Sequence, residues 1–444
     1  MRRGKGLSTA ARGLCLSAFL LLAGCATYSQ QFDAVESQLA AGNLQAAMTA
    51  LEKSHGNGSR GDRVLYLLNR AMLLRMQGEY RQSNQVLEEA KQLIDELDAV
   101  SVSEQAGSLT VSDTLKSYIG SDFERALIHL YAALNYLQMG MQDEARVEVM
   151  QLDVLLNLQA GRNGDDYVED AFVRYLSGLV FEELGEWSDA MIAYRKAYRD
   201  YRNYQRHFGV KPPRSLGLAL LRLADHLGLK DELRQYREAF GIRQWPSLRD
   251  TQGQGEVVVI VSTGLAPSKR EESSTVLAPE AGVMVRIALP RYEPHAQPVA
   301  GARLLVDGES QEAELVEDID ALAIKTLEAQ MPLITARAIA RAVVKYRAAK
   351  EVGEHNQGLG LLMNVAGMIS EQADTRSWST LPQRIYLARR LLPPGQHDLS
   401  LRLVGHDGRM LAQKRFPAVT VEAGRKVYLT WRWIPPIPHG EKRS

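Results

Sequence analysis

The residue pattern of this chain changes abruptly near its middle, and this change limits the fold more than any other feature. Between residues 28 and 241, apolar side chains recur every three or four positions, and the only prolines are Pro212 and Pro213. That spacing is the period of an α-helix. Further on, prolines and glycines become frequent, and Val257–Val261 is a β-branched run. We therefore predict a helical half followed by a strand-rich half, with the boundary near residues 243–255.

A turn is repeated within the helical half. In four places a helix is expected to end at a glycine, an aromatic or apolar residue usually follows two positions later, and a small residue comes three positions after that. Glycine suits the end of a helix because it adopts the left-handed backbone conformation without strain. Tyr80 and Ala145 hold the aromatic and the small position in the second and third copies. The four turn glycines are Gly42, Gly78, Gly140 and Gly185.

The last copy of this turn is the most complete. Its matching positions are Gly178, Phe181, Gly185, Trp187, Ala190, Tyr194 and Ala197. The pattern resembles the tetratricopeptide repeat, which implies an α-solenoid whose stacked helix pairs form a concave protein-binding surface. The alternative is an all-α packing domain without a binding groove. The turn glycines lie 36, 62 and 45 residues apart instead of about 34, so we expect an irregular solenoid with a fifth helix pair at 215–240.

The second half is predicted to be a β-sandwich-like domain with inserted helices, which makes the whole chain an α+β multidomain protein. Short apolar stretches separated by Pro-, Gly- and Asp-containing turns suit a sandwich. The expected strands are 255–262, 283–289, 303–306, 383–389, 397–404, 418–421 and 426–433.

The helical insertion is expected near residues 316–372, as helices at 318–330, 334–351 and 359–371. On the second helix, Arg337, Arg341 and Lys345 lie four residues apart and form a basic stripe. This stripe either meets anionic lipid or cell-wall polymer, or is a solvated face that pairs with the acidic residues of 312–320.

The N-terminus has the pattern of a secretory signal peptide, with a basic start, an apolar run over 14–22 and small residues before a cysteine. Leu22, Ala23, Gly24 and Cys25 resemble the lipobox of bacterial lipoproteins, in which the cysteine is acylated and becomes the mature N-terminus. The alternative is an ordinary signal peptide that contains a cysteine. Ala26, in place of aspartate, resembles the sorting signal for the outer membrane.

The predicted organisation follows from these features. It comprises a signal peptide at 1–24, helical repeats at 25–245, a linker at 246–254, the sandwich-like domain at 255–434 and a flexible tail at 435–444.

The sequence carries no motif typical of a catalytic centre. It lacks a Gly-x-Ser-x-Gly elbow, a His-Glu-x-x-His pair and a phosphate-binding P-loop, and its nine histidines are scattered. Lysines and arginines equal acidic residues at 53 each, and no concentrated basic face indicates nucleic-acid binding. We therefore expect a non-enzymatic protein without a metal or small-molecule cofactor.

One loop combines residue types that are common in binding sites. Asp374, Arg376 and Trp378 lie together before a predicted strand, and arginine with tryptophan is typical of interaction hot spots. The loop either contacts a partner, or its Asp374 and Arg376 pair internally while Trp378 fills the core.

The whole chain resembles an uncharacterised family of proteobacterial lipoproteins with tetratricopeptide-like repeats. The resemblance is carried by Ala373–Trp378, by Leu381-Pro382 and by Leu392–Gly395. Members are often encoded beside lipoproteins of the penicillin-binding-protein activator type, which implies an envelope or peptidoglycan setting and assigns no activity. We expect a lipid-anchored, periplasm-facing scaffold at the outer membrane that binds an envelope protein through its repeats. The alternatives are a cell-wall enzyme with an unrecognised site and a surface-exposed adhesin-like module.

Overall fold

The computed structural model describes residues 28–56, 60–104, 116–163, 170–278, 282–355 and 372–436. The signal peptide, Cys25, the helix expected at 359–371 and most of the C-terminal tail lie outside these ranges.

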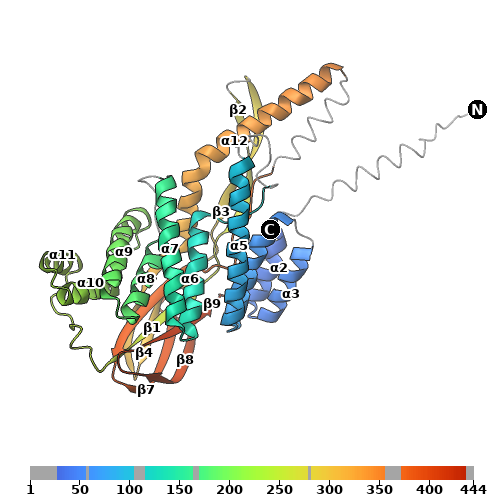
Figure 1. The fold of residues 1–444 in the computed structure, drawn as a ribbon. Coiled ribbons are helices and arrows are strands. Elements are labelled where there is room, and N and C mark those ends of the chain that lie inside the picture. Colours follow the sequence, from blue (N-terminus) through green and yellow to red (C-terminus); the bar gives the residue numbers. More distant parts are fainter. Residues whose placement is uncertain are drawn as a thin grey trace, which may run out of the picture.

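The helical half consists of consecutive helix pairs, each joined by a tight turn (Figure 1). The 3₁₀ helix η1 (Arg60–Asp62) precedes the second pair. The pairs are α2 (Tyr28–Ala40) with α3 (Leu44–Gly56), α4 (Arg63–Met76) with α5 (Tyr80–Glu104), α6 (Asp122–Gln138) with α7 (Gln142–Asn163), α8 (Ala171–Glu183) with α9 (Trp187–Phe208), and α10 (Arg214–His226) with α11 (Lys230–Phe240).

The turn glycines adopt the left-handed backbone conformation that is expected of glycines at the ends of helices. The backbone φ angles of Gly42, Gly78, Gly140 and Gly185 are 73°, 85°, 69° and 72°. Gly228 has φ 71° in the same position of the fifth pair. Each pair therefore reverses the chain at one residue, which keeps its two helices in contact.

The repeat residues pack the helices closely. A Cβ atom on Gly178 would lie 2.2 Å from the ring of Tyr194, so α8 and α9 touch at a position where only glycine fits. The small residues Ala145, Ala190 and Ala197 are fully buried with Tyr194, and Phe181 is half-buried. Trp187 meets the ring of His226 edge-on, and Tyr80 donates a hydrogen bond from its hydroxyl to Gln138 Oε1 at 3.4 Å.

Seven strands of the second half form one continuous sheet in the order β8-β7-β4-β5-β6-β1-β9. Only the pairing of β1 with β9 is parallel. The strands are β1 (Gly255–Thr263), β4 (Val299–Val306), β5 (Glu309–Asp318), β6 (Arg384–Leu392), β7 (Gly395–Gly405), β8 (Met410–Val421) and β9 (Lys426–Trp433). Because the end strands β8 and β9 contact each other, the sheet is nearly closed. The expected sandwich of two stacked sheets is not confirmed, since a curled single sheet buries its inner face against itself.

A separate two-stranded sheet consists of β2 (Ser268–Ala278) and β3 (Val283–Glu293). Within the described residues, the helical insertion is one helix, α12 (Ile319–His355), which continues through Pro332. The prediction of two helices separated at Pro332 is wrong, because a proline removes one hydrogen bond and the packing of the helix on β2 and β3 holds it together beyond that point.

The two faces of the curled sheet bury different cores. Alternate side chains such as Val257, Val259 and Leu401 fill the inside of the curl. Those pointing the other way, including Val258 and Tyr428, join the core of the helical half. In Figure 1 the sheet lies at one end of the helices, and β2, β3 and α12 project at the opposite end. The two halves therefore share one core.

Candidate partner-binding surface

The inner layer of the helical repeats is covered by the protein's own second half. Helices α4, α6, α8 and α10 are buried along most of their length, and in helical solenoids such a layer lines the concave binding surface. Tyr201 donates to the carbonyl of Val316 at 2.9 Å, and Gln138 donates to that of Tyr428 at 2.7 Å. The expectation that concave helices supply the contacts to an external peptide is wrong for this structure, because the sheet occupies that surface.

A buried cluster of charges joins α8 to the sheet. Arg389 binds Glu182 at 3.0 Å and Glu256 at 2.8 Å, and Lys426 lies 3.6 Å from Glu182. Burial alone would raise the pKa of Glu182, but the charges of Arg389, Lys426 and Arg222 outweigh it and hold that pKa well below its usual range. Its carboxylate is therefore ionised and committed to an internal contact.

The candidate partner loop is also internal. Arg376 donates to both carboxylate oxygens of Asp374 at 2.9 Å and reaches Asp62 of η1 at 3.2 Å. Trp378 is 1 % exposed and meets the ring of Tyr131 on α6 edge-on. The hypothesis that Asp374, Arg376 and Trp378 contact a partner is corrected, because these side chains fasten the loop to the helices instead of facing solvent.

Glu124 accepts a hydrogen bond from this loop, and the sequence analysis did not identify this residue. Its Oε1 accepts the backbone N–H of Trp378 at 2.6 Å, and its Oε2 accepts the hydroxyls of Ser121 and Tyr118 at 2.7 and 2.6 Å. Ser121 and Glu124 form a capping box at the start of α6. The Ser-x-x-Glu spacing was the available signal, although it indicates a helix start and not a tertiary contact.

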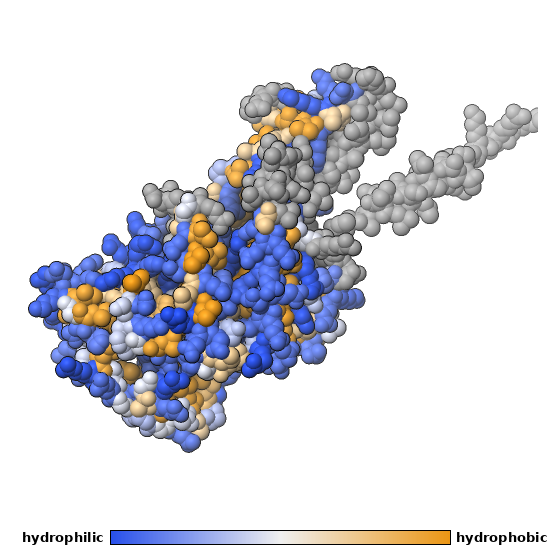
Figure 2. Space-filling model, viewed as in Figure 1, coloured by the Kyte–Doolittle hydropathy of each residue, from blue (hydrophilic) through white to orange (hydrophobic). Residues whose placement is uncertain are grey.

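The outer layer carries an exposed apolar stripe on α7. Val147, Met150, Val154 and Leu158 are between 46 and 61 % exposed and follow one another at intervals of three, four and four residues. The opposite face of α7 is apolar too, with Ala145, Val149, Leu152 and Leu156 buried. A helix that is apolar on both faces is normally covered on both. Figure 2 shows part of this stripe as apolar patches in the middle of the visible face.

Ion pairs border the stripe on both sides. Towards α9, Arg146 binds Glu186 at 2.8 Å and Lys196 binds Asp153 at 2.6 Å. Towards α5, Lys91 binds Glu148 at 3.0 Å. Ile192, one turn before Lys196, adds a further exposed apolar side chain. An apolar centre with a charged rim is the usual anatomy of a protein interface.

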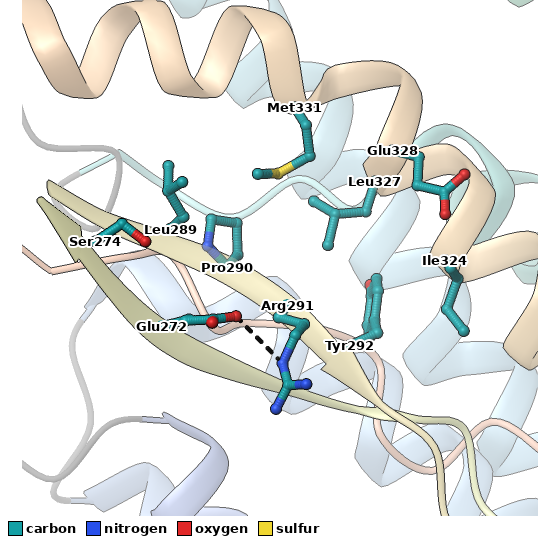
Figure 3. Close-up of a pocket in the computed structure, with 10 residues that line it drawn as sticks. All are labelled: Glu272, Ser274, Leu289, Pro290, Arg291, Tyr292, Ile324, Leu327, Glu328 and Met331. Carbon is teal, nitrogen blue, oxygen red and sulfur yellow. Dashed lines mark ion pairs between the residues drawn. The ribbon is translucent and has the colours of Figure 1, made fainter. Parts of the chain in front are cut away.

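Two cavities of the described residues are lined by side chains that already make structural contacts. A groove of about 350 Å³ lies between α12 and β3, where Leu327 and Met331 face Leu289 and Pro290 (Figure 3). A second cavity of about 560 Å³ is lined by Glu256, Glu312 and Glu314. Each of these carboxylates already accepts hydrogen bonds, from Arg389, from Arg303 and from the backbone of Ser215 respectively. They are therefore engaged in structural contacts.

Two further features are absent from the described ranges. Within them, no group of three or more histidine, cysteine or acidic side chains is arranged to hold a metal ion. None of the helices there combines the length and the apolar character required to cross a membrane.

Comparison with known proteins returns distant structural likenesses. No family model matches the chain, and no curated protein sequence matches it. A crystal structure of MamA is 16 % identical, with a TM-score of 0.30 over 46 % of this chain and 90 % of MamA. A tetratricopeptide repeat protein from Parabacteroides merdae is 14 % identical, with a TM-score of 0.30 over 48 % of this chain and 65 % of its own. Pseudomonas aeruginosa pilF is 16 % identical, with a TM-score of 0.29 over 46 % and 75 %.

Proposed function

We propose that this protein is a scaffold lipoprotein of the bacterial envelope, anchored through Cys25 to the outer membrane and facing the periplasm. Its partner is an envelope protein linked to peptidoglycan synthesis, and the outer layer of the repeats holds it. The observation that carries the binding role is the exposed apolar stripe of Val147, Met150, Val154 and Leu158.

The geometry of the stripe favours a helical partner. Apolar residues at intervals of three and four, as in this stripe, form the seam along which two helices pack. The rim holds cations and carboxylates on both sides, so a partner helix with charges beside its own apolar seam would complete the contact. We therefore propose that the occupant is an amphipathic helix of the partner.

The binding role is tested by photo-crosslinking in cells. A photoreactive residue at Val154 is expected to form one dominant crosslink, and the same residue at Gln85, an exposed polar position on α5, is expected to form none. Val147→Glu with Leu158→Glu should abolish the crosslink because charges disfavour burial in the seam. Gln85→Glu is the matched control. Equal crosslinking from both positions, or persistence in the double variant, would contradict the proposal.

The anchor is tested separately by acyl labelling. The wild-type chain should incorporate radioactive palmitate and sediment with membranes after a high-salt wash, and Cys25→Ser should do neither. Cys15→Ser should behave as wild type, because the proposed lipid is carried by Cys25 alone. Labelling of the Cys25→Ser variant would exclude this anchor.

A further inference from the structure

An arm formed by β2, β3 and α12 projects from the body of the protein (Figure 1). Its two layers pack through a small core in which Val285 and Ile287 of the hairpin meet Ala338 and Ala342 of the helix. This core is separate from those of the body. The 37 residues of α12 correspond to a length of about 55 Å. The arm therefore adds an extended surface to that of the body.

Both outer faces of the arm expose large apolar side chains. Leu277 and Met284 are direct cross-strand partners beside the hairpin turn and point away from α12. Leu333 and Val344 lie eleven residues apart, on the side of α12 turned away from the hairpin. All four are between 49 and 61 % exposed. Figure 2 shows apolar residues along the arm.

The outer half of α12 is strongly basic. Between Leu333 and Lys350 the helix carries five basic residues and no acidic one, namely Arg337, Arg341, Lys345, Arg347 and Lys350. Arg286 adds a positive charge on the outer face of the hairpin, opposite Thr275 in the strand pairing. The acidic residues of the arm lie outside this stretch: Glu272 binds Arg291 at 3.5 Å, Glu328 binds Lys325 at 3.3 Å, and Glu351 and Glu354 follow Lys350 along α12.

The acidic residues of β5 do not neutralise this basic stretch. Glu312 binds Arg303, Glu314 accepts the backbone N–H of Ser215, and Asp318 binds Arg384. The expected pairing of Arg337, Arg341 and Lys345 with this acidic run is therefore wrong, because β5 lies inside the seven-stranded sheet.

We propose that the end of the arm inserts into the surface of an anionic membrane. A rigid protein partner would cover one of the two apolar faces, whereas a lipid interface surrounds the inserted end and covers both. Exposed apolar side chains interleaved with arginine and lysine are the composition of segments that lie at the boundary between lipid head groups and acyl chains. The exposed basic residues Arg286, Arg347 and Lys350 meet the lipid phosphates, and Leu277, Met284, Leu333 and Val344 enter the apolar layer.

The position of the N-terminus agrees with this orientation, and here the inference rests on the lipid anchor of the proposed function. Cys25 precedes Tyr28, the first residue of α2, by three positions, a reach of about 10 Å. Helix α2 lies beside the base of the arm, with Asp33 3.4 Å from Arg270 and Glu36 3.4 Å from His295. A lipid on Cys25 would thus hold the base of the arm close to the bilayer.

The test places an environment-sensitive fluorophore on a single introduced cysteine in the full acylated chain. Met284→Cys reports the end of the arm. Met410→Cys, equally exposed on β8 at the opposite end of the molecule, is the matched control. With vesicles of phosphatidylethanolamine and phosphatidylglycerol, emission from position 284 should rise several-fold and shift to the blue. Emission from position 410 should stay constant. Vesicles of phosphatidylcholine alone, or 0.5 M salt, should weaken the response because they remove or screen the attraction.

Charge reversal supplies the second variant. Arg347→Glu with Lys350→Glu should reduce the response at position 284 at least threefold, while Arg409→Glu on the far side should leave it unchanged. Both variants should keep the wild-type melting temperature, since the replaced side chains are exposed.

The proposal for the arm and the proposal for the lipid anchor can be contradicted independently of each other. A chain that floats with vesicles but shows no change at position 284 overturns the arm proposal and leaves the anchor intact. A chain that floats only with anionic vesicles and responds at position 284 supports the arm and contradicts the anchor. A response at position 284 that appears only when membrane proteins are present would overturn lipid insertion in favour of a protein partner.

Discussion

At the residue scale, the close contacts between helices depend on a few positions where volume is limiting. Gly178 faces the ring of Tyr194 directly, and the hydroxyl of Tyr194 in turn donates to Glu182 in the buried charge cluster. A side chain at position 178 would displace the tyrosine and disturb that hydrogen bond. The sequence indicated the glycine through its place in the repeat, but the link to Glu182 depends on the packing of the sheet.

Replacing Gly178 with alanine should destabilise the protein by about 1–3 kcal/mol, the usual cost of overpacking. Gly161, an exposed glycine on α7 with no atom within 4 Å of an added Cβ, is the matched control. Gly161→Ala should be neutral or stabilising by about 0.5–1 kcal/mol, because alanine favours helix. Denaturant unfolding curves measure both changes. Equal stability of the two variants would contradict the close contact.

At the scale of elements, the sequence predicts whether a segment is a helix or a strand better than it predicts which faces of that segment are covered by other elements. Periodicity identified helix pairs that contain the turn glycines, and β-branched runs identified strands such as β1. The sequence analysis missed β2 because the charged residues Lys269–Glu272 resemble a loop. It missed β5 because the acidic side chains of that strand resemble a solvated segment, whereas in the fold they pair with residues of other elements. The stripe on α7 was also missed, since a helical period states which residues share a face but not whether that face is covered.

The junction of α8 and β5 shows a contact between elements that the sequence could not reveal. Asp170 caps α8 by accepting the N–H of Val173 at 3.1 Å, and Glu317 of β5 lies against it, fully buried. Burial raises the pKa of Glu317 well above its usual range, and the carboxylate of Asp170 raises it further. Burial also raises the pKa of Asp320 nearby to about 7. The junction therefore retains protons that an unfolded chain would release above about pH 4.5.

The protons that the folded state retains at this junction make the stability of the fold depend on pH. Because the folded form binds more protons than the unfolded form above the ordinary carboxyl pKa, its stability should fall as pH rises from about 5 to 8. Glu317→Gln keeps a hydrogen-bonding partner for Asp170 without that titration, so its melting temperature should vary less across the same interval. Glu312→Gln, on the exposed side of β5, should keep the wild-type slope. Thermal melts at several pH values measure this, and a wild-type melting temperature that increases with pH would exclude it.

At the scale of the whole molecule, the change in residue pattern near residues 243–255 marks a change of secondary structure within one body. Core residues of the helices and of β1, β6 and β9 belong to one cluster, and the charge cluster and the 373–383 loop cross between the halves. Local patterns cannot predict this, because each half is a plausible domain by itself. It follows that the helical half lacks its natural cover when the sheet is removed.

A chain that ends at residue 245 should therefore fail to fold cooperatively. We expect broad thermal unfolding, binding of a dye specific for exposed apolar surface, and association at micromolar concentration. The full chain should show a single transition that both halves share. The full-length Trp378→Ala variant is the control, because it loses the contacts of one core side chain but keeps the sheet over the helices. It should keep one transition at a stability reduced by about 3–5 kcal/mol. A sharp, dye-free transition in the truncated chain would show that the halves fold independently.

The position of β9 has a consequence for biosynthesis. This strand lies against β1 and supplies Tyr428 to the helical core, yet it is synthesised after all the helices that it covers. The inner faces of the helices thus stay uncovered until β9 has been synthesised, and exposed apolar surface attracts chaperones and promotes aggregation during that period. A premature stop codon even a few residues upstream of Lys426 would leave the polypeptide without its closing strand and direct it to proteolysis.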